Sequence, residues 1–170
     1  MAAYHEVGHA VAGTVLGATL DFVTIVPMKV NGKLGVGYCC WKDQPETGTW
    51  NDWFLDIVRF KAGQVAQALA CRVTWLDYGS GSDDAGAREV AEFLHQHTDD
   101  SHARSKQVKA TLKSATQMAR SILLSPYGRA AVQALAEALV EQGTVQGREA
   151  TLLLLAEPRD HFKYDHRKEE

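Results

Sequence analysis

Apolar residues near the N-terminus recur at helical spacing and stop at a glycine. Val7, Val11 and Val15 lie four residues apart, which places them on one face of a helix. Gly17 follows this stripe, and glycine commonly takes the left-handed conformation that ends a helix. The pattern therefore predicts a helix that begins near Ala3 and ends at Gly17.

The next segments are short and rich in β-branched residues. Residues 21–27 form one such run, residues 34–41 form another, and Asn31-Gly32 between them is a hairpin-turn signal. These features predict two strands of a small sheet. Gly35 and Gly37 interrupt the second strand, where they either form a bulge or let another extended backbone approach closely.

Helical spacing returns after the predicted strands. A Thr-x-x-Asp start signal at Thr49 precedes an apolar-rich helix that runs to about Ala70. The apolar residues predicted to form its core face are Trp50, Trp53, Phe54, Ile57, Val58, Val65 and Leu69. Further helices are predicted from a cap at Ser82, over about 99–124, over 129–142 after a break at 126–128, and over about 147–156.

The composition is that of one globular domain. The chain has 170 residues, of which 45% are hydrophobic and 23% charged, enough for one core and hardly enough for two. We expect a single, mostly helical domain with a small sheet over residues 1–157. Residues 158–170 mix both charges with few apolar residues, so we expect a charged C-terminal tail there.

Charge and apolar patterning argue against two classes of partner. The net charge is −3. The sequence also has no cluster of Lys and Arg interleaved with aromatic residues, which is the pattern that would indicate a nucleic-acid surface. No apolar run approaches the roughly 18 residues of a membrane-spanning helix, and no signal-peptide pattern is present.

Cys39, Cys40 and Cys71 lack the spacing of a disulfide framework or a zinc site. We therefore expect them to be reduced core residues in a cytoplasmic protein.

The predicted first helix carries the pattern His-Glu-x-x-His. His5 and His9 lie one turn apart, about 40° around the axis, and so point the same way. Two imidazoles so placed can hold one metal ion, and Glu6 can reach a water molecule on that metal. The five residues alone would arise by chance in roughly one or two of a hundred such chains. Their place on a predicted helix indicates a zinc hydrolase.

A second acidic segment begins the helix after Ser82. From the residues alone, Asp83 and Asp84 are explained by the favourable interaction of carboxylates with the N-terminus of a helix. The Gly/Ser-rich loop before them lacks the Lys of a phosphate-binding loop, and two carboxylates would repel a phosphate. Nucleotide binding is therefore disfavoured.

Six segments, in order and at matching spacing, resemble one known family. Together they look like the peptidase domain of the FtsH family of ATP-dependent zinc metalloproteases, over roughly residues 2–155. The segments are residues 3–10, 23–27, 34–38, 62–66, 81–84 and 139–149.

The resemblance implies a zincin-like α+β domain, mostly α-helical, with one zinc ion. In the family, the two histidines of the motif and the second acidic residue of a Gly-x-Ser-Asn-Asp segment hold the metal. The implied zinc ligands are therefore His5, His9 and Asp84, with Asp83 as the neighbour that another register would select. Glu6 is the implied general base that deprotonates a zinc-bound water.

The expected function is a zinc-dependent metalloendopeptidase that hydrolyses peptide bonds in unfolded or flexible polypeptides. The alternative is an inactive zinc-binding scaffold or interaction domain. Glu6 favours the enzyme, because a purely structural zinc site gains little from a base beside the metal. No residue is assigned to stabilise the oxyanion. His95, His97 and His102 are the nearest downstream candidates, although a solvated helix face explains them more simply.

The sequence also departs from the family. It lacks the Gly-x-x-x-x-Gly-Lys-Ser/Thr motif of the family's ATPase module and any membrane anchor. The family's Arg-Ala-Ala-Glu-Glu run is replaced by residues 64–68, which read Gln-Val-Ala-Gln-Ala. We therefore expect a polypeptide substrate and an ATPase that is either lost or supplied by a separate unfoldase chain. The rings of the family imply self-association into a homo-oligomer, although the ATPase that helps to form them is absent here.

Overall fold

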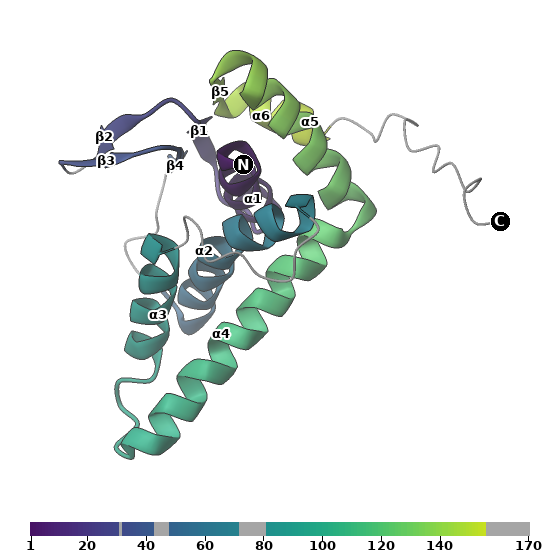
Figure 1. The fold of residues 1–170 in the computed structure, drawn as a ribbon. Helices are drawn as coiled ribbons and strands as arrows, with labels where there is room; N and C mark the ends of the chain where they lie inside the picture. The colour runs from purple at the N-terminus through teal and green to yellow at the C-terminus, as the bar shows by residue number, and fades with distance from the viewer. Residues whose placement is uncertain (31, 43–47, 72–80, 156–170) are drawn as a thin grey trace.

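The computed structural model describes residues 1–30, 32–42, 48–71 and 81–155. These residues form a mostly helical fold with a small antiparallel sheet, as predicted (Figure 1). The helices are α1 (Ala2–Val15), α2 (Trp50–Cys71), α3 (Gly81–Leu94), α4 (Ser101–Leu124), α5 (Pro126–Gln142) and α6 (Gly147–Leu155). The strands are β1 (Leu20–Thr24), β2 (Met28–Val30), β3 (Lys33–Gly35), β4 (Tyr38–Trp41) and β5 (Thr144–Gln146).

The main sheet has the order β4-β1-β5, and β2 and β3 form a separate hairpin (Figure 1). Strand β1 is antiparallel to both neighbours, so that Val23 lies opposite Cys39 in β4 and Val145 in β5. The sequence predicted two strands where the chain forms β1 to β4, and it did not predict β5. The Thr24 hydroxyl reinforces this added pairing by donating to the Gly143 carbonyl at 3.0 Å.

The predicted start and stop signals are present at the ends of α1 and α2. Gly17 follows α1 with a φ of +89°, the left-handed conformation expected there. Thr49 and Asp52 form a reciprocal cap at the start of α2. The Thr49 N–H donates to Asp52 Oδ2 at 2.7 Å, and the Asp52 N–H donates to Thr49 Oγ1 at 3.3 Å.

Two helix starts differ from the prediction. Helix α5 begins at Pro126 rather than after residue 128, because Ser125 caps it by accepting the Gly128 N–H, and proline fits the first helical turn. Helix α3 begins at Gly81, so Ser82 lies inside the first turn instead of capping it.

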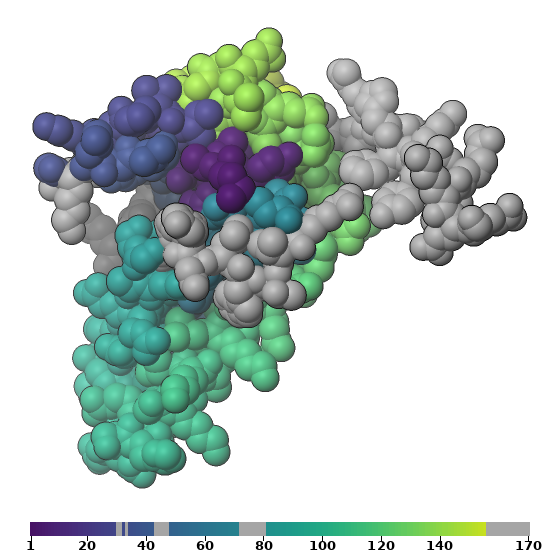
Figure 2. Space-filling view, viewed as in Figure 1, coloured from purple at the N-terminus to yellow at the C-terminus, as the bar shows by residue number. Residues whose placement is uncertain are grey.

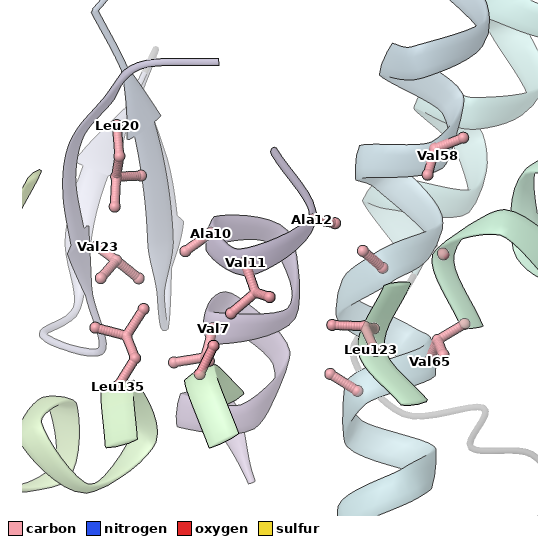
Figure 3. Packing of buried hydrophobic residues seen from close by; sticks show 14 of the residues in the cluster. Val7, Ala10, Val11, Ala12, Leu20, Val23, Val58, Val65, Leu123 and Leu135 are labelled. Atoms are coloured by element: carbon pink, nitrogen blue, oxygen red, sulfur yellow. The ribbon is translucent and has the colours of Figure 1, made fainter. Parts of the chain in front are cut away.

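Helix α1, which carries the His-Glu-x-x-His motif, lies at the centre of the core. Its residues Val7, Ala10, Val11 and Ala12 are fully buried. In Figure 3, α1 stands between the sheet with α5 on one side and α2 on the other. The buried residues labelled around it are Leu20, Val23 and Leu135, and Val58, Val65 and Leu123. Packing on both sides fixes the direction in which the motif points.

Some residues predicted to be in the core are not buried. Trp50 is 54% exposed, because it opens α2 where the helix leaves the core, and it stacks on Phe54 with ring centroids 5.4 Å apart. Cys39, Cys40 and Cys71 are free thiols of intermediate exposure. Cys39 packs against the hydrophobic core as expected, whereas Cys40 and Cys71 are not among the residues that form it.

Within the described ranges, no helix is both long and apolar enough to cross a bilayer. The predicted tail over 158–170 and Asn31 of the predicted turn lie outside the described residues.

Candidate metal centre

Three side chains from two distant segments meet at one point. Helix α1 presents His5 and His9, whose ring centroids are 4.8 Å apart. Asp83, in the first turn of α3, places its Oδ2 atom 2.7 Å from His5 Nε2 and 3.3 Å from His9 Nε2. One ligand atom from each residue lies within 4.8 Å of the others. Two imidazole nitrogens and a carboxylate oxygen in so small a space are a suitable ligand set for zinc.

The aspartate at this point is Asp83, whereas the resemblance had implied Asp84. Consecutive helical residues point about 100° apart, so only one of the two can face the histidines of α1. Asp83 does so, and Asp84 instead forms an ion pair with Lys61 of α2. The carboxylate that lies with His5 and His9 is thus Asp83, the neighbour that another register selects, and not Asp84.

Helix α2 supplies an acceptor for the opposite nitrogen of each imidazole. His9 Nδ1 lies 2.7 Å from the Arg59 carbonyl oxygen, and His5 Nδ1 lies 3.2 Å from Gln67 Oε1. Each ring thus has an acceptor at both nitrogens, because Asp83 faces the Nε2 atoms. A neutral imidazole has only one N–H to donate. The arrangement suits either a protonated ring or a neutral ring whose Nε2 lone pair binds a metal ion.

Two glycines make room for the motif side chains. A Cβ atom at Gly63 of α2 would lie 2.4 Å from His9 Nε2 and 2.9 Å from His5 Nε2. A Cβ atom at Gly37, just before β4, would lie 2.6 Å from Glu6 Oε1. All three distances are shorter than any ordinary contact, so a side chain at either position would displace a site residue.

Sequence reasoning missed the contribution of α2 to the site. Arg59, Gly63 and Gln67 are spaced four residues apart and lie along the face of α2 that meets the histidines. The signal for them is a row of small and polar residues at four-residue spacing in the half of α2 that is otherwise rich in apolar residues. Gln67 is only 6% exposed, and a buried polar side chain normally has a specific partner.

Charges at the site shift the ionisation of three groups. Burial raises the pKa of Glu6, an effect that the neighbouring His9 and His5 partly offset. Burial would lower the pKa of His9, but the hydrogen bond and charge of Asp83 raise it above its usual value. Burial opposes ionisation of Asp83 as well, yet hydrogen bonds with His5 and His9 hold its pKa well below the usual range. Without a metal, Asp83 is therefore an anion beside a ring that protonates readily.

A cavity of about 900 Å³ opens beside these residues. Glu6 and the three clustered side chains lie in its wall, and the rest of the wall is largely apolar and aromatic. These apolar and aromatic residues include Val36, Tyr38, Trp41, Trp53, Phe60 and Val90. His5 and His9 are the only histidines among the described residues that line it, so His95, His97 and His102 are not placed to stabilise an oxyanion there. His95 instead contacts the Thr111 hydroxyl at 2.9 Å.

No family model matches this sequence, and a search of curated proteins finds no relative. What the site does must therefore be argued from its own chemistry.

Proposed function

We propose that this protein is a zinc-dependent metalloendopeptidase in which His5, His9 and Asp83 hold the zinc. The supporting observation is the convergence of their three ligand atoms within 4.8 Å, in the wall of a cavity that Glu6 also lines. Three protein ligands leave a fourth coordination position open, which is typical of catalytic rather than structural zinc. The further proposal that the fold is zincin-like and related to FtsH peptidase domains rests on the motifs of the sequence.

The residues around the metal have separable roles. When bound, zinc supplies Lewis acidity, which polarises a carbonyl group and lowers the pKa of water to about 7. Glu6 accepts a proton from the attacking water and returns it to the nitrogen of the leaving amine. Burial raises the pKa of Glu6 in the metal-free site, whereas a zinc ion nearby would favour the ionised carboxylate that the first step requires. The Arg59 carbonyl and Gln67 hold the two imidazoles in orientation.

The sheet edge offers a place for an extended polypeptide. Strand β4 is an outer strand of the three-stranded sheet, and Tyr38 and Cys39 of β4 line the cavity together with Gly37. A peptide that adds as a strand to this edge would cross the cavity beside Glu6. Such binding requires an extended backbone, which supports unfolded or flexible polypeptides as the substrate class.

The test is cleavage of casein by the purified chain and by its Glu6→Gln variant, with bound zinc counted in both. Loss of the general base should reduce the cleavage rate by about 10²- to 10⁴-fold, while the zinc content stays the same because Glu6 is not a ligand. The matched control is Glu141→Gln, an exposed carboxylate on α5 that should leave cleavage unchanged. If the chain binds zinc but cleaves neither casein nor an unfolded peptide, the inactive zinc-binding scaffold becomes the better description.

An unfoldase partner, self-association and a cytoplasmic location remain predictions from the sequence. The same assay addresses the first of them, because cleavage of unfolded casein without any added ATPase would make an unfoldase unnecessary for the chemistry.

A further inference from the structure

The apolar part of the cavity wall comes from three separate elements. Trp53 and Phe60 belong to α2, Val90 belongs to α3, and Tyr38 and Trp41 belong to β4. All five residues are partly buried, so each still presents some of its surface to the cavity. Binding pockets are typically lined by such side chains, with few polar groups among them. A cavity of about 900 Å³ with this wall has room for a large side chain of a bound polypeptide.

The charged side chains of the wall already have partners. Arg59 is the only Lys or Arg among the described residues that line the cavity, and it forms an ion pair with Asp56. The Arg59 guanidinium also lies 5.6 Å from the centre of the Trp41 ring. Asp83 faces the two histidines. The described wall therefore has no unpaired cation for an acidic side chain, and its remaining carboxylate, Glu6, belongs to the proposed catalytic centre.

Val36 lies at the edge of this wall, between β3 and β4, and is 67% exposed. It is one of only two exposed large hydrophobic residues of the described part of the chain that line the cavity. Both of its neighbours are glycines. A Cβ atom at Gly35 would lie 2.6 Å from the Cε2 atom of Tyr38. At Gly37 it would lie 2.6 Å from Glu6 Oε1, so the backbone packs closely on both sides of Val36.

The segment that contains Val36 stands next to the helix that carries the motif. In Figure 2, residues 20–42 lie directly beside the start of α1, and α3 is further down in the same view. The contact between Gly37 and Glu6 joins this segment to α1. A polypeptide at the metal centre would therefore pass close to Val36.

We propose that the cavity binds a large apolar side chain of the polypeptide substrate, such as Phe, and that Val36 is a specificity-determining residue that packs against it. The inference rests on the proposed function for the nature of the ligand. Contact between Val36 and an apolar side chain removes both from water, which is favourable. A charged side chain would instead lose its hydration without gaining a partner.

The experiment measures binding of labelled peptides to the full chain that carries Glu6→Gln, in a buffer that contains zinc, so that no peptide is cut. The peptides are short, acetylated, amidated and rich in Gly and Ser, and they differ in one central residue: Phe, Ala, Glu or Lys. Fluorescence anisotropy of a terminal fluorescein reports binding. We expect the Phe peptide to bind at least about tenfold more tightly than each of the others, because even one methylene in an apolar pocket changes binding by about tenfold or more. Equal affinity for the Phe and Ala peptides, tighter binding of the Glu or Lys peptide, or no binding of any peptide would overturn the proposal.

Two variants test whether Val36 makes the selection. Val36→Gln should lower the affinity for the Phe peptide by at least about fivefold and lower its ratio to the affinity for the Ala peptide, because the apolar contact is lost. The matched control is Leu34→Gln in β3, two residues away. Leu34 is 69% exposed but does not line the cavity, so both the affinity and the ratio should be retained. Equal effects of the two replacements would contradict the role of Val36.

Failure of this inference and failure of the proposed function have different signatures. Cleavage of casein by the unmodified chain, together with no preference among the peptides, would refute the apolar selection alone. Preference for the Phe peptide without any cleavage of casein would refute the peptidase and leave the cavity as a polypeptide-binding site.

Discussion

Replacing Gly63 with alanine would add one methyl group where both histidines meet α2. The new Cβ would lie 2.4 Å from His9 Nε2 and 2.9 Å from His5 Nε2, whereas carbon and nitrogen normally approach to about 3.5 Å. His9 would have to move by about 1 Å. It cannot do so freely, because its Nδ1 is hydrogen-bonded to the Arg59 carbonyl at 2.7 Å.

This displacement should weaken zinc binding strongly and lower the stability of the fold only slightly. Ligand distances in a metal site hold to about 0.2 Å, and disturbing only the outer partners of ligands already costs about 10- to 100-fold in metal affinity. We therefore expect Gly63→Ala to weaken zinc binding by at least about 100-fold. Overpacking costs about 1–3 kcal/mol of stability, and the better helix propensity of alanine returns about 1 kcal/mol. The net loss of stability should be about 0–2 kcal/mol.

Zinc affinity can be measured by competition with a chromophoric chelator, and stability by urea unfolding of the metal-free protein. The matched control is Gly81→Ala at the start of α3, where an added Cβ has nothing within 4 Å. It should bind zinc as the unmodified protein does. If Gly63→Ala also retains full zinc affinity, the metal does not bind at the Nε2 atoms beside α2, and the proposed centre is refuted.

Two further predictions concern the same centre. Asp83→Asn should lower zinc affinity by at least about 100-fold, whereas Asp84→Asn, whose carboxylate pairs with Lys61, should keep it; equal losses in zinc titrations would contradict the choice of Asp83. Zinc affinity should fall between pH 8 and pH 6, because the raised pKa of His9 keeps its ring protonated to higher pH and a ligand must be neutral. Zinc titrations at the two pH values measure the affinity, and an affinity that does not change with pH would refute the reasoning.

Features set by neighbouring residues could be predicted from the sequence. The direction shared by His5 and His9 follows from their spacing within one helix, and the structure places their rings 4.8 Å apart. The cap of α2 at Thr49 and Asp52 likewise depends on residues three positions apart. In both cases the geometry of a single helix decides the outcome, so no tertiary information is needed.

Features set by the docking of distant segments could not be predicted from the sequence. The choice between Asp83 and Asp84 depends on how α3 is rotated against α1, across a separation of 78 residues. Strand β5 has only three residues and sits between two helices, so its own pattern is too short to reveal it. Its pairing is fixed by burial of Val145 against β1. The role of Gln67 depends on the packing of α1 on α2, which brings Gln67 Oε1 next to His5 Nδ1.

The pairing of β1 with β5 has a consequence for the order in which the protein folds during synthesis. Thr24 meets Thr144 across 120 residues of chain, so β1 emerges from the ribosome long before its second neighbour exists. Closing so long a loop costs little more free energy than closing a shorter one, but contacts this distant in sequence form slowly. Leu135 of α5, which packs beside α1, is also made late. A nascent chain that already contains His5, His9 and Asp83 therefore lacks part of the support of α1. For a peptidase, this order would delay full activity until the growing polypeptide has reached residue 146.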